Sequence, residues 1–345
     1  MLYIHDTTCI SPQQTLGDID IKHLKSADGN KMMALEPSYQ NIPTPVLRRM
    51  GKAVRMSVGA AMPLLQHFKP DGLIIGTANG GMEDCIKFLN QIIVYEEGML
   101  TPGNFVQSTP NAIASQISLL SANTAYNITH VHRGLAFENA ILDAIMLLKE
   151  YPDRGFLVGG VDEISSYNYN IDNLEGWYKK ETVNNTSLYL TGSPGTIAGE
   201  GAAMFLVKAT SAGAIARLRG IAMLHTTDEN QVLAGLEAFS NKYLLPGERI
   251  DLLLSGENGD SRHLKFYEIC EGFLGSKTAV GRFKHMSGEY PTASAFAVWL
   301  ACTIIQKKSA PAQILKSPPT ASAITNILIY NNFKGNQHSF ILLSC

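Results

Sequence analysis

The sequence predicts a layered α/β fold, because two kinds of segment alternate along its 345 residues. Short apolar runs bounded by glycine, aspartate or proline have the length of buried strands, and helix-length amphipathic runs separate them. Hydrophobic residues make up 45% of the chain, which excludes a disordered protein. The formal charge of -2 provides no positive surface for nucleic acid or an anionic membrane, so neither partner is expected.

Each predicted strand is a short aliphatic run that ends near a small or turn-forming residue. The strands are Gly72–Gly76, Gly155–Gly160, Ala202–Val207, Asp251–Ser255, Ile324–Tyr330 and Ser339–Ser344. Longer runs predict helices at Val46–Phe68, Gly81–Glu97, Asn111–Leu120, Gly134–Lys149 and Ala293–Gln306. The small, polar stretch Lys208–Ala214 follows a strand and lacks helical character, so we predict two halves, residues 1–210 and 211–345.

The cysteines and the N-terminal segment place the chain in a reducing compartment. The five cysteines form no CxxC pair and have no spacing typical of zinc ligands, so neither disulfides nor a metal site is predicted. The first residues lack the basic and apolar regions of a signal peptide, and no apolar run is long enough to span a bilayer. We therefore expect a soluble, cytoplasmic protein, and we predict no cofactor.

Six blocks of the sequence occur in an order that can be compared with that of a known protein family. They are YIHDTTCISPQQT, IPTPVLRRMGKAVRMSVGAA, IIGTANGGMEDCIKFLNQ, the run from Leu100 to Gly134, GFLVGGVDE and TIAGEGAAMFLV. In this order they resemble the β-ketoacyl synthase family of thiolase-fold condensing enzymes. The resemblance implies a thiolase-like, five-layered αβαβα fold of two pseudo-repeated halves. It also implies dimerisation and substrates that are carried as thioesters on an acyl carrier protein.

The nucleophile position of that family is altered in this chain. The family places a catalytic cysteine on a strand-to-helix turn, in the pattern AC.SG. Aligning Gly134 of NITHVHRG with the glycine of this pattern puts Val131 at the cysteine position, between His130 and His132. Valine has neither a lone pair nor an ionisable proton, so covalent acyl transfer at this position is excluded.

The other catalytic positions of the family are altered as well. The first histidine motif aligns with IDLLLSGENGDS and puts Gly256 at the histidine position. The second aligns with KHMSGEYPTASA, where Lys284 is kept and Glu289 replaces the histidine, and a carboxylate there would repel an enolate. The glycine-rich gating loop is reduced to NNFKGNQHS, which keeps Phe333.

Three interpretations of His130 and His132 are open. A metal site lacks a recognisable further ligand. A general base acting on bound substrate requires a positioned partner. The favoured interpretation is that both side chains fill the vestigial pocket or contribute to a subunit interface.

Two functions follow from the resemblance. The favoured one is a non-catalytic subunit, similar to the chain-length factors of type II polyketide synthases and the related subunits of aryl-polyene pathways, that pairs with an active ketosynthase. The alternative is an acyltransferase-class enzyme of fatty acid or polyketide synthesis that uses His130, His132 and Glu289, with Glu257 as a weaker candidate. A third possibility is a homodimeric module that binds a carrier protein or acyl groups. The resemblance implies that segments 107–116 and 123–127 contribute to the dimer interface.

Overall fold

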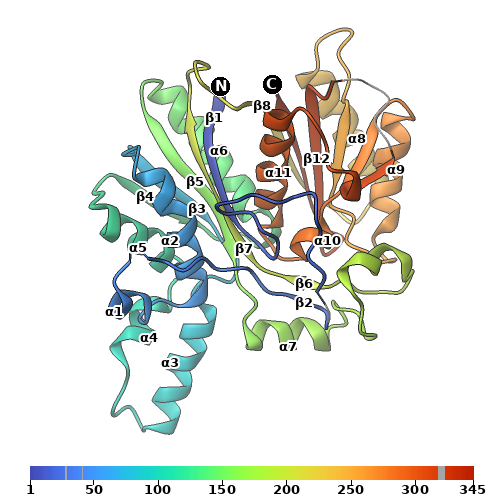
Figure 1. The fold of residues 1–345 in the computed structure, drawn as a ribbon. Coiled ribbons are helices and arrows are strands. Elements are labelled where there is room, and N and C mark those ends of the chain that lie inside the picture. Colours follow the sequence, from blue (N-terminus) through green and yellow to red (C-terminus); the bar gives the residue numbers. More distant parts are fainter. Residues whose placement is uncertain (28, 41, 318–322) are drawn as a thin grey trace.

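The strands of the two halves follow one another in the same way along the chain. The computed structural model describes residues 1–27, 29–40, 42–317 and 323–345 (Figure 1). The first half contributes β1 (Leu2–Ile10), β3 (Gly72–Gly76), β4 (Tyr126–His130), β5 (Gly155–Asp162) and β7 (Gly201–Lys208). The second contributes β8 (Ala216–His225), β9 (Leu252–Ser255), β10 (Ala279–Arg282), β12 (Asn326–Phe333) and β13 (Gln337–Ser344). The short strands are β2 (Lys31–Met32), β6 (Ala198–Gly199) and β11 (Leu315–Ser317).

The pairing of these strands is repeated in the two halves. In the first half, β3 lies parallel to β4 and β5, and β7 lies antiparallel to β5 and β1. In the second half, β9 lies parallel to β10 and β12, and β13 lies antiparallel to β12 and β8. An antiparallel pairing of β1 with β8 joins the two sets. The halves are therefore alike in topology, and a division at residue 210 stays a prediction.

The helices connect the strands and cover their faces. They are α1 (Thr44–Leu47), α2 (Lys52–Leu65), α3 (Met82–Val94), α4 (Pro102–Gln107), α5 (Ala112–Ser121), α6 (Ala136–Glu150), α7 (Ser166–Leu174), α8 (Glu229–Tyr243), α9 (Leu264–Leu274), α10 (Lys284–Ser287) and α11 (Ala293–Lys307). Three short 3-10 turns complete the set: η1 (Arg133–Leu135), η2 (Asn185–Leu190) and η3 (Ala312–Ile314). None of the helices in the described ranges has the length and apolar content needed to cross a bilayer.

The buried side chains divide into layers. Because successive residues of a strand point to opposite faces, Ile74 of β3 packs toward α6 and α11, whereas Leu73 and Ile75 pack toward α2 and α5. In the second half Leu254 packs toward the same central pair of helices and Leu253 toward α8 and α9. The strands of the first half form what is called the first sheet below, and those of the second half form the second sheet, although β1 and β8 pair across the boundary. The order of layers is α2/α5, first sheet, α6/α11, second sheet, α8/α9 (Figure 1). This is the expected αβαβα arrangement.

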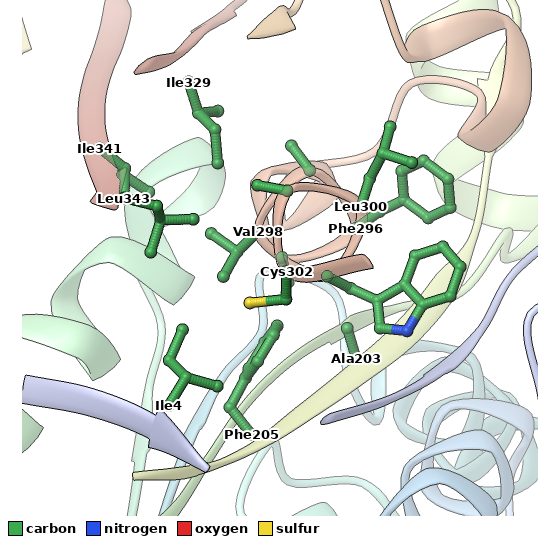
Figure 2. Packing of buried hydrophobic residues seen from close by; sticks show 14 of the residues in the cluster. Ile4, Ala203, Phe205, Phe296, Val298, Leu300, Cys302, Ile329, Ile341 and Leu343 are labelled. Atoms are coloured by element: carbon green, nitrogen blue, oxygen red, sulfur yellow. The ribbon is translucent and has the colours of Figure 1, made fainter. Parts of the chain in front are cut away.

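Helix α11 lies in the middle layer and is buried on every side. Each of its residues from Ala293 to Ile305 is buried. In Figure 2, Val298 and Cys302 of α11 lie between Ile4 and Phe205 of the first half and Ile341 of the second. A helix that is apolar all round is the expected solution for a layer that contacts a sheet on both sides.

The predicted helix Val46–Phe68 is wrong in one respect, because the chain forms two helices there. Helix α1 ends at Leu47 and α2 begins at Lys52, after Gly51 in an extended conformation. A side chain at Gly51 would collide with the Asp84 carboxylate. The backbone N–H of Ala53, free at the start of α2, donates to Glu163 Oε2 at 2.9 Å. The break thus depends on residues distant in sequence.

Asp162, at the end of β5, links the first half to the central helix. Its Oδ1 accepts hydrogen bonds from the Ala78 and Asn79 backbone N–H groups at 2.9 and 2.8 Å and from Thr77 Oγ1 at 3.1 Å. Its Oδ2 accepts from the backbone N–H and hydroxyl of Thr292, just before α11, at 3.1 and 2.9 Å. A fully buried carboxylate is tolerated when donors satisfy it in this way.

We predict that Asp162→Asn lowers the free energy of unfolding by roughly 2 to 4 kcal/mol, because an amide N–H₂ would face donors in a buried site. Chemical denaturation measures this loss. Asp153→Asn, at an exposed position, is the matched control and should stay within about 0.5 kcal/mol of the parent. Equal effects of the two substitutions would contradict the assigned role of Asp162.

Candidate functional site

A cleft of about 330 Å³ lies at the carboxyl ends of β3, β4 and β5, where the β12–β13 hairpin crosses them. Ligands of parallel α/β sheets commonly bind at this edge. The cleft is lined by Ala78, Asn79, Arg133, Glu163, Ile164, Asn168, Tyr169, Ile171, Asp172, Glu175, Trp177, Tyr178, Gly199, Glu289, Tyr290, Pro291, Phe333 and Lys334. The turn between β4 and α6, which contains Val131, His132 and Arg133, is called the elbow below. The cleft brings together the elbow, the segment around Glu289 and the hairpin that carries Phe333.

At the elbow, Arg133 and not Val131 lines the cleft. Val131 is 53% exposed on the outside of the turn. Arg133 has φ +48, a left-handed conformation, and directly precedes Gly134. A Cβ on Gly134 would lie 2.3 Å from Phe333 Cβ, and its backbone N–H donates to Gln337 Oε1 at 2.9 Å. The elbow is therefore clamped against the hairpin, and only glycine fits at this point of contact.

The two histidines of the elbow are bonded to helix α6. His130 Nε2 lies 3.0 Å from Asp143 Oδ2, and His132 Nδ1 lies 2.8 Å from Asn139 Nδ2. Neither histidine is among the residues that line the cleft, and the structure does not bring them near Glu289. Within the described ranges no group of three or more potential metal-ligating side chains is assembled. Both imidazoles thus connect the β4 edge to α6.

Glu289 reaches the cleft wall from a fully buried ion pair. Lys284 Nζ lies 2.6 Å from Glu289 Oε1, both side chains are completely buried, and Asn258 Nδ2 donates to Glu289 Oε2 at 2.9 Å. Burial raises the pKa of Glu289 and lowers the pKa of Lys284, and the attraction between the two opposes both shifts. The carboxylate of Glu289, which is predicted to stand at the family's second histidine position, is thus paired with the neighbouring lysine.

The backbone holds Glu289 in place through a close contact of two glycines. Its N–H donates to Ile197 O at 2.8 Å, and its carbonyl accepts from the Gly199 N–H at 2.9 Å. A Cβ on Gly199 would lie 2.1 Å from Ser287 O, and Gly288 has φ +69, which favours glycine. Glycine at both positions lets the two chain segments pair directly.

Gly256, which is predicted to stand at the first histidine position, has no room for a side chain. Its N–H donates to Tyr330 O at 2.7 Å, and a Cβ would lie 2.6 Å from Asn331 Oδ1. It does not line the cleft. The next residue, Glu257, is paired with Arg282 at 3.1 Å and Lys316 at 2.8 Å, which gives it a structural role.

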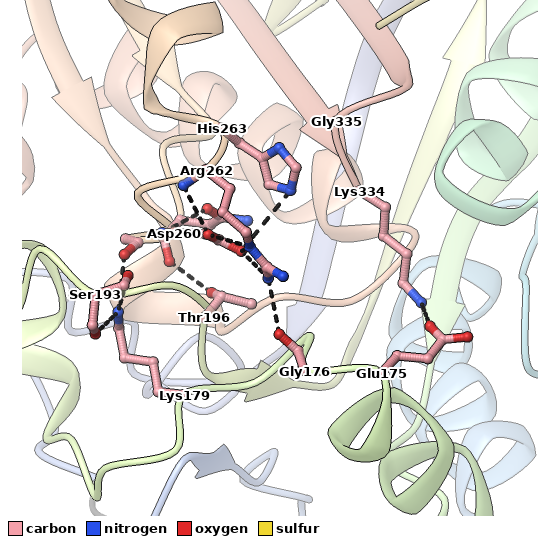
Figure 3. A network of polar contacts seen from close by, with 12 residues as sticks. Glu175, Gly176, Lys179, Ser193, Thr196, Asp260, Arg262, His263, Lys334 and Gly335 are labelled. Atoms are coloured by element: carbon pink, nitrogen blue, oxygen red, sulfur yellow. Dashed lines mark hydrogen bonds and ion pairs between the residues drawn. The ribbon is translucent and has the colours of Figure 1, made fainter.

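The hairpin at the former gating loop is tied to α7 by an ion pair. Lys334 Nζ lies 2.6 Å from Asp172 Oδ1 and 3.1 Å from Glu175 Oε2 (Figure 3). Phe333 stacks edge-on against Trp177, with ring centroids 6.0 Å apart. Lys334 has φ +53 in this turn. The aromatic wall and the ion pair together hold one side of the cleft.

A second polar network holds the segment of the cleft wall that carries Trp177. Arg262 forms an ion pair with Asp260 and donates to Gly176 O at 2.9 Å (Figure 3). Lys179 Nζ donates to the backbone oxygens of Ser193 and Gly259, each at 3.0 Å. These contacts tie the loop after β9 to the segment that carries Trp177, far from it in sequence.

Glu163 is a wall residue that sequence reasoning missed. It is the residue after β5 and lines both this cleft and a second one of about 660 Å³ beside α1 and α2. Burial raises its pKa to about 7, and the carboxylates of Asp84 and Glu200 add to the rise, while the Ala53 N–H opposes it. The GGVDE block contained Glu163, but nothing in the sequence indicated its burial or its neighbours.

Comparisons with known proteins agree with the fold described above. Residues 24–180 match the family model of the β-ketoacyl synthase N-terminal domain. No curated protein matches the sequence. A β-ketoacyl synthase from Burkholderia phymatum STM815 is similar in structure, with a TM-score of 0.81, 13% identity and coverage of 99% of this chain and 98% of the other.

Two solved complexes are also similar in structure. One contains a ketosynthase (ApeO) with its chain length factor (ApeC) from Xenorhabdus doucetiae, with a TM-score of 0.75, 13% identity and coverage of 99% and 97%. The other contains a type II polyketide synthase acyl carrier protein with its ketosynthase bound to the hexaketide (AntDE:AntF), with a TM-score of 0.74, 14% identity and coverage of 100% and 99%. The chain thus resembles the β-ketoacyl synthase family and has the thiolase-like fold of ketosynthases.

We predict that Lys284→Met lowers the free energy of unfolding by about 3 to 5 kcal/mol, because it leaves the Glu289 carboxylate buried without its partner. The double variant Lys284→Met/Glu289→Gln should cost less than the sum of the two single variants, since the two charges disappear together. Urea denaturation of all three variants measures the coupling. In the exposed pair of Lys265 and Glu229, 3.3 Å apart, the same cycle should give less than about 1 kcal/mol. A buried pair no more strongly coupled than the exposed pair would refute this account.

We predict that Glu163→Gln stabilises the protein at alkaline pH and not at acidic pH. The folded protein holds a proton on Glu163 up to a pKa of about 7, whereas a free glutamate releases it near 4.5, so stability falls as pH rises between these values. The gain in the free energy of unfolding should be near zero at pH 4.5 and should level off above pH 7 at about 3 kcal/mol or less. Denaturation at several pH values measures it, with exposed Glu237→Gln as the control. A gain independent of pH would rule this explanation out.

Proposed function

We propose that this chain is a non-catalytic, ketosynthase-like subunit, similar to a chain-length factor, that pairs with an active β-ketoacyl synthase in a type II synthase. The observation that carries the proposal is the elbow. The alignment with the family puts Val131 at the nucleophile position. Val131 is 53% exposed and does not line the cleft, and no cysteine is among the residues that do. A condensing enzyme requires an activated nucleophile at that point.

The edge of the first sheet supports pairing with another subunit. Among the described residues β4 pairs with β3 alone, so its outer edge has unpaired backbone groups. We define the β4 face as β4 and the exposed apolar residues around it on α5, the elbow and α6: Leu119, Tyr126, Val131, Leu142 and Met146. An open strand edge beside exposed apolar side chains is a typical site of chain association.

The predicted interface segments lie beside this face. Thr129 Oγ1 of β4 donates to Asn111 Oδ1, at 3.1 Å, in segment 107–116. Asn127, the last residue of segment 123–127, donates to Ser118 Oγ of α5 at 2.6 Å. Both contacts favour a partner that adds to the β4 edge. The similar ApeO–ApeC structure is a ketosynthase with its chain length factor, which supports an active ketosynthase over a second copy of this chain.

The second cleft supports a carrier protein as a further partner. It is lined by five basic side chains, Arg48, Arg49, Lys52, Arg55 and Lys87, and by the carboxylates of Glu83, Asp84 and Glu163. Lys52, Arg55 and Lys87 are paired with carboxylates, whereas Arg48 and Arg49 have no ion pair within the described residues. We propose that the acidic face of an acyl carrier protein contacts these two arginines.

Co-expression with an intact ketosynthase from the same gene neighbourhood tests the main proposal. We expect a stable heterodimer, and we expect Met146→Asp to weaken it at least tenfold, because the new charge is desolvated in an apolar interface. Light scattering after size exclusion and a binding titration measure assembly. Met146 is 62% exposed, and Leu174→Asp on α7, at 87% exposure, is the matched control that should leave assembly unchanged.

An activity assay separates the proposal from the enzyme alternative. The isolated chain, incubated with acyl- and malonyl-carrier proteins, should give no condensation product, and activity should appear only with the ketosynthase present. Turnover by the isolated chain that is lost in His132→Ala would overturn the proposal in favour of the enzyme. A homodimer that forms through the β4 face and excludes the ketosynthase would also contradict it.

A further inference from the structure

Arg133 is a cation without a partner at the wall of the first cleft. The other charged residues of the wall are engaged: Lys334 with Asp172 and Glu175, Glu289 with Lys284, and Glu163 with the Ala53 N–H. The Arg133 guanidinium forms neither a hydrogen bond nor an ion pair with any described residue. A guanidinium offers a planar fork of donors that matches a carboxylate.

The backbone at Arg133 is strained, and the fold maintains the strain. A left-handed conformation is unfavourable for a non-glycine residue, and Arg133 adopts it with φ +48. The contact of Gly134 with Phe333 and its hydrogen bond to Gln337 impose the turn. Strain of this kind persists where surrounding structure holds it, and it is concentrated at ligand sites.

The walls beside Arg133 suit a flat or aliphatic body. The cleft is lined by the aromatic rings of Trp177, Tyr178, Tyr290 and Phe333, and Phe333 is also in contact with Gly134, next to Arg133. Asn79 and Asn168 add amide groups that can donate to an oxygen atom. A volume of about 330 Å³ is at the small end of ligand pockets. It accommodates a small molecule or the end of a longer one.

The charges of the wall disfavour an anion that carries more than one charge. The wall carries two cations, Arg133 and Lys334, and four carboxylates, Glu163, Asp172, Glu175 and Glu289. Lys284 neutralises Glu289, and Lys334 serves both Asp172 and Glu175. With Lys284 counted, three cations face four carboxylates, so any anion meets some repulsion here, and the repulsion is larger for a doubly charged ligand such as phosphate. A monocarboxylate meets the smaller repulsion and can pair with the guanidinium of Arg133.

We propose that this cleft binds small monocarboxylates, with the carboxylate on the Arg133 guanidinium and an aromatic or aliphatic body against Trp177 and Phe333. This site goes beyond the role of a partner subunit. It requires neither a ketosynthase nor a carrier protein, so heterodimer assembly and carboxylate binding can fail independently.

Tryptophan fluorescence provides a local readout. The chain contains two tryptophans, and both are buried: Trp299 lies in α11, away from the cleft, whereas Trp177, at 6% exposure, lines the cleft. We expect benzoate and hexanoate to change the tryptophan emission in a saturable manner. Their uncharged amide analogues, benzamide and hexanamide, should bind at least tenfold more weakly. Inorganic phosphate should not compete with benzoate. Equal binding of acids and amides, or displacement of benzoate by phosphate, would overturn the proposal.

The Arg133→Asn variant tests the residue itself. Asparagine tolerates the left-handed conformation, so the variant should be at least as stable as the parent while its affinity for benzoate falls at least tenfold. Arg154→Asn is the matched control, because Arg154 is an exposed arginine whose guanidinium lies over the Tyr151 ring, and it should leave binding unchanged. Calorimetric titration repeats the measurement without fluorescence. An Arg133→Asn protein that is folded and binds benzoate with the affinity of the parent would refute the assignment.

Discussion

The buried carboxylate of Asp162 is the interaction on which the geometry of the cleft depends. Its oxygens accept five hydrogen bonds, three from the turn after β3 and two from Thr292. These donors come from both halves, so the carboxylate adds to the strand pairing, the apolar packing and other polar contacts between the halves, such as that of the Gly134 N–H with Gln337. Thr292 immediately precedes α11, so the same carboxylate positions the helix that fills the middle layer. The two walls of the cleft are thereby held at a set distance.

The residues at the positions that are predicted to be altered are held by contacts within the fold. Glu289 is paired with Lys284 inside the protein, Gly256 packs against Asn331, and His130 and His132 are bonded to α6. Each of these residues has contacts within the protein, so its polar groups are satisfied and its conformation is defined by its neighbours. Arg133, by contrast, is exposed, has a strained backbone conformation and lines the cleft together with aromatic residues. The chemistry this surface can perform is recognition of an anion, which needs positioned charge but no nucleophile.

Two surfaces of different character lie near one another in the first half. The β4 face combines an open strand edge with exposed apolar side chains, which suits a protein partner. The second cleft combines basic side chains with few apolar ones, which suits an acidic partner. Glu163 lies between that cleft and the first, and it caps α2 through Ala53. Glu163 is therefore a wall residue that the two clefts share.

From the residues alone, the apolar runs predicted the buried strands, because this pattern is local. That Val131 stands at the nucleophile position followed from the resemblance to the family, and it stays a prediction. The sequence missed β4, whose polar pattern reflects a strand at a sheet edge with one neighbour. It also predicted one helix where Gly51 separates two, since the carboxylate that caps α2 comes from Glu163, more than a hundred residues away. Which elbow residue faces the cleft was decided by the packing of Gly134 against Phe333. Contacts of this range arise only when the layers assemble, so only the tertiary structure shows that Arg133 lines the site.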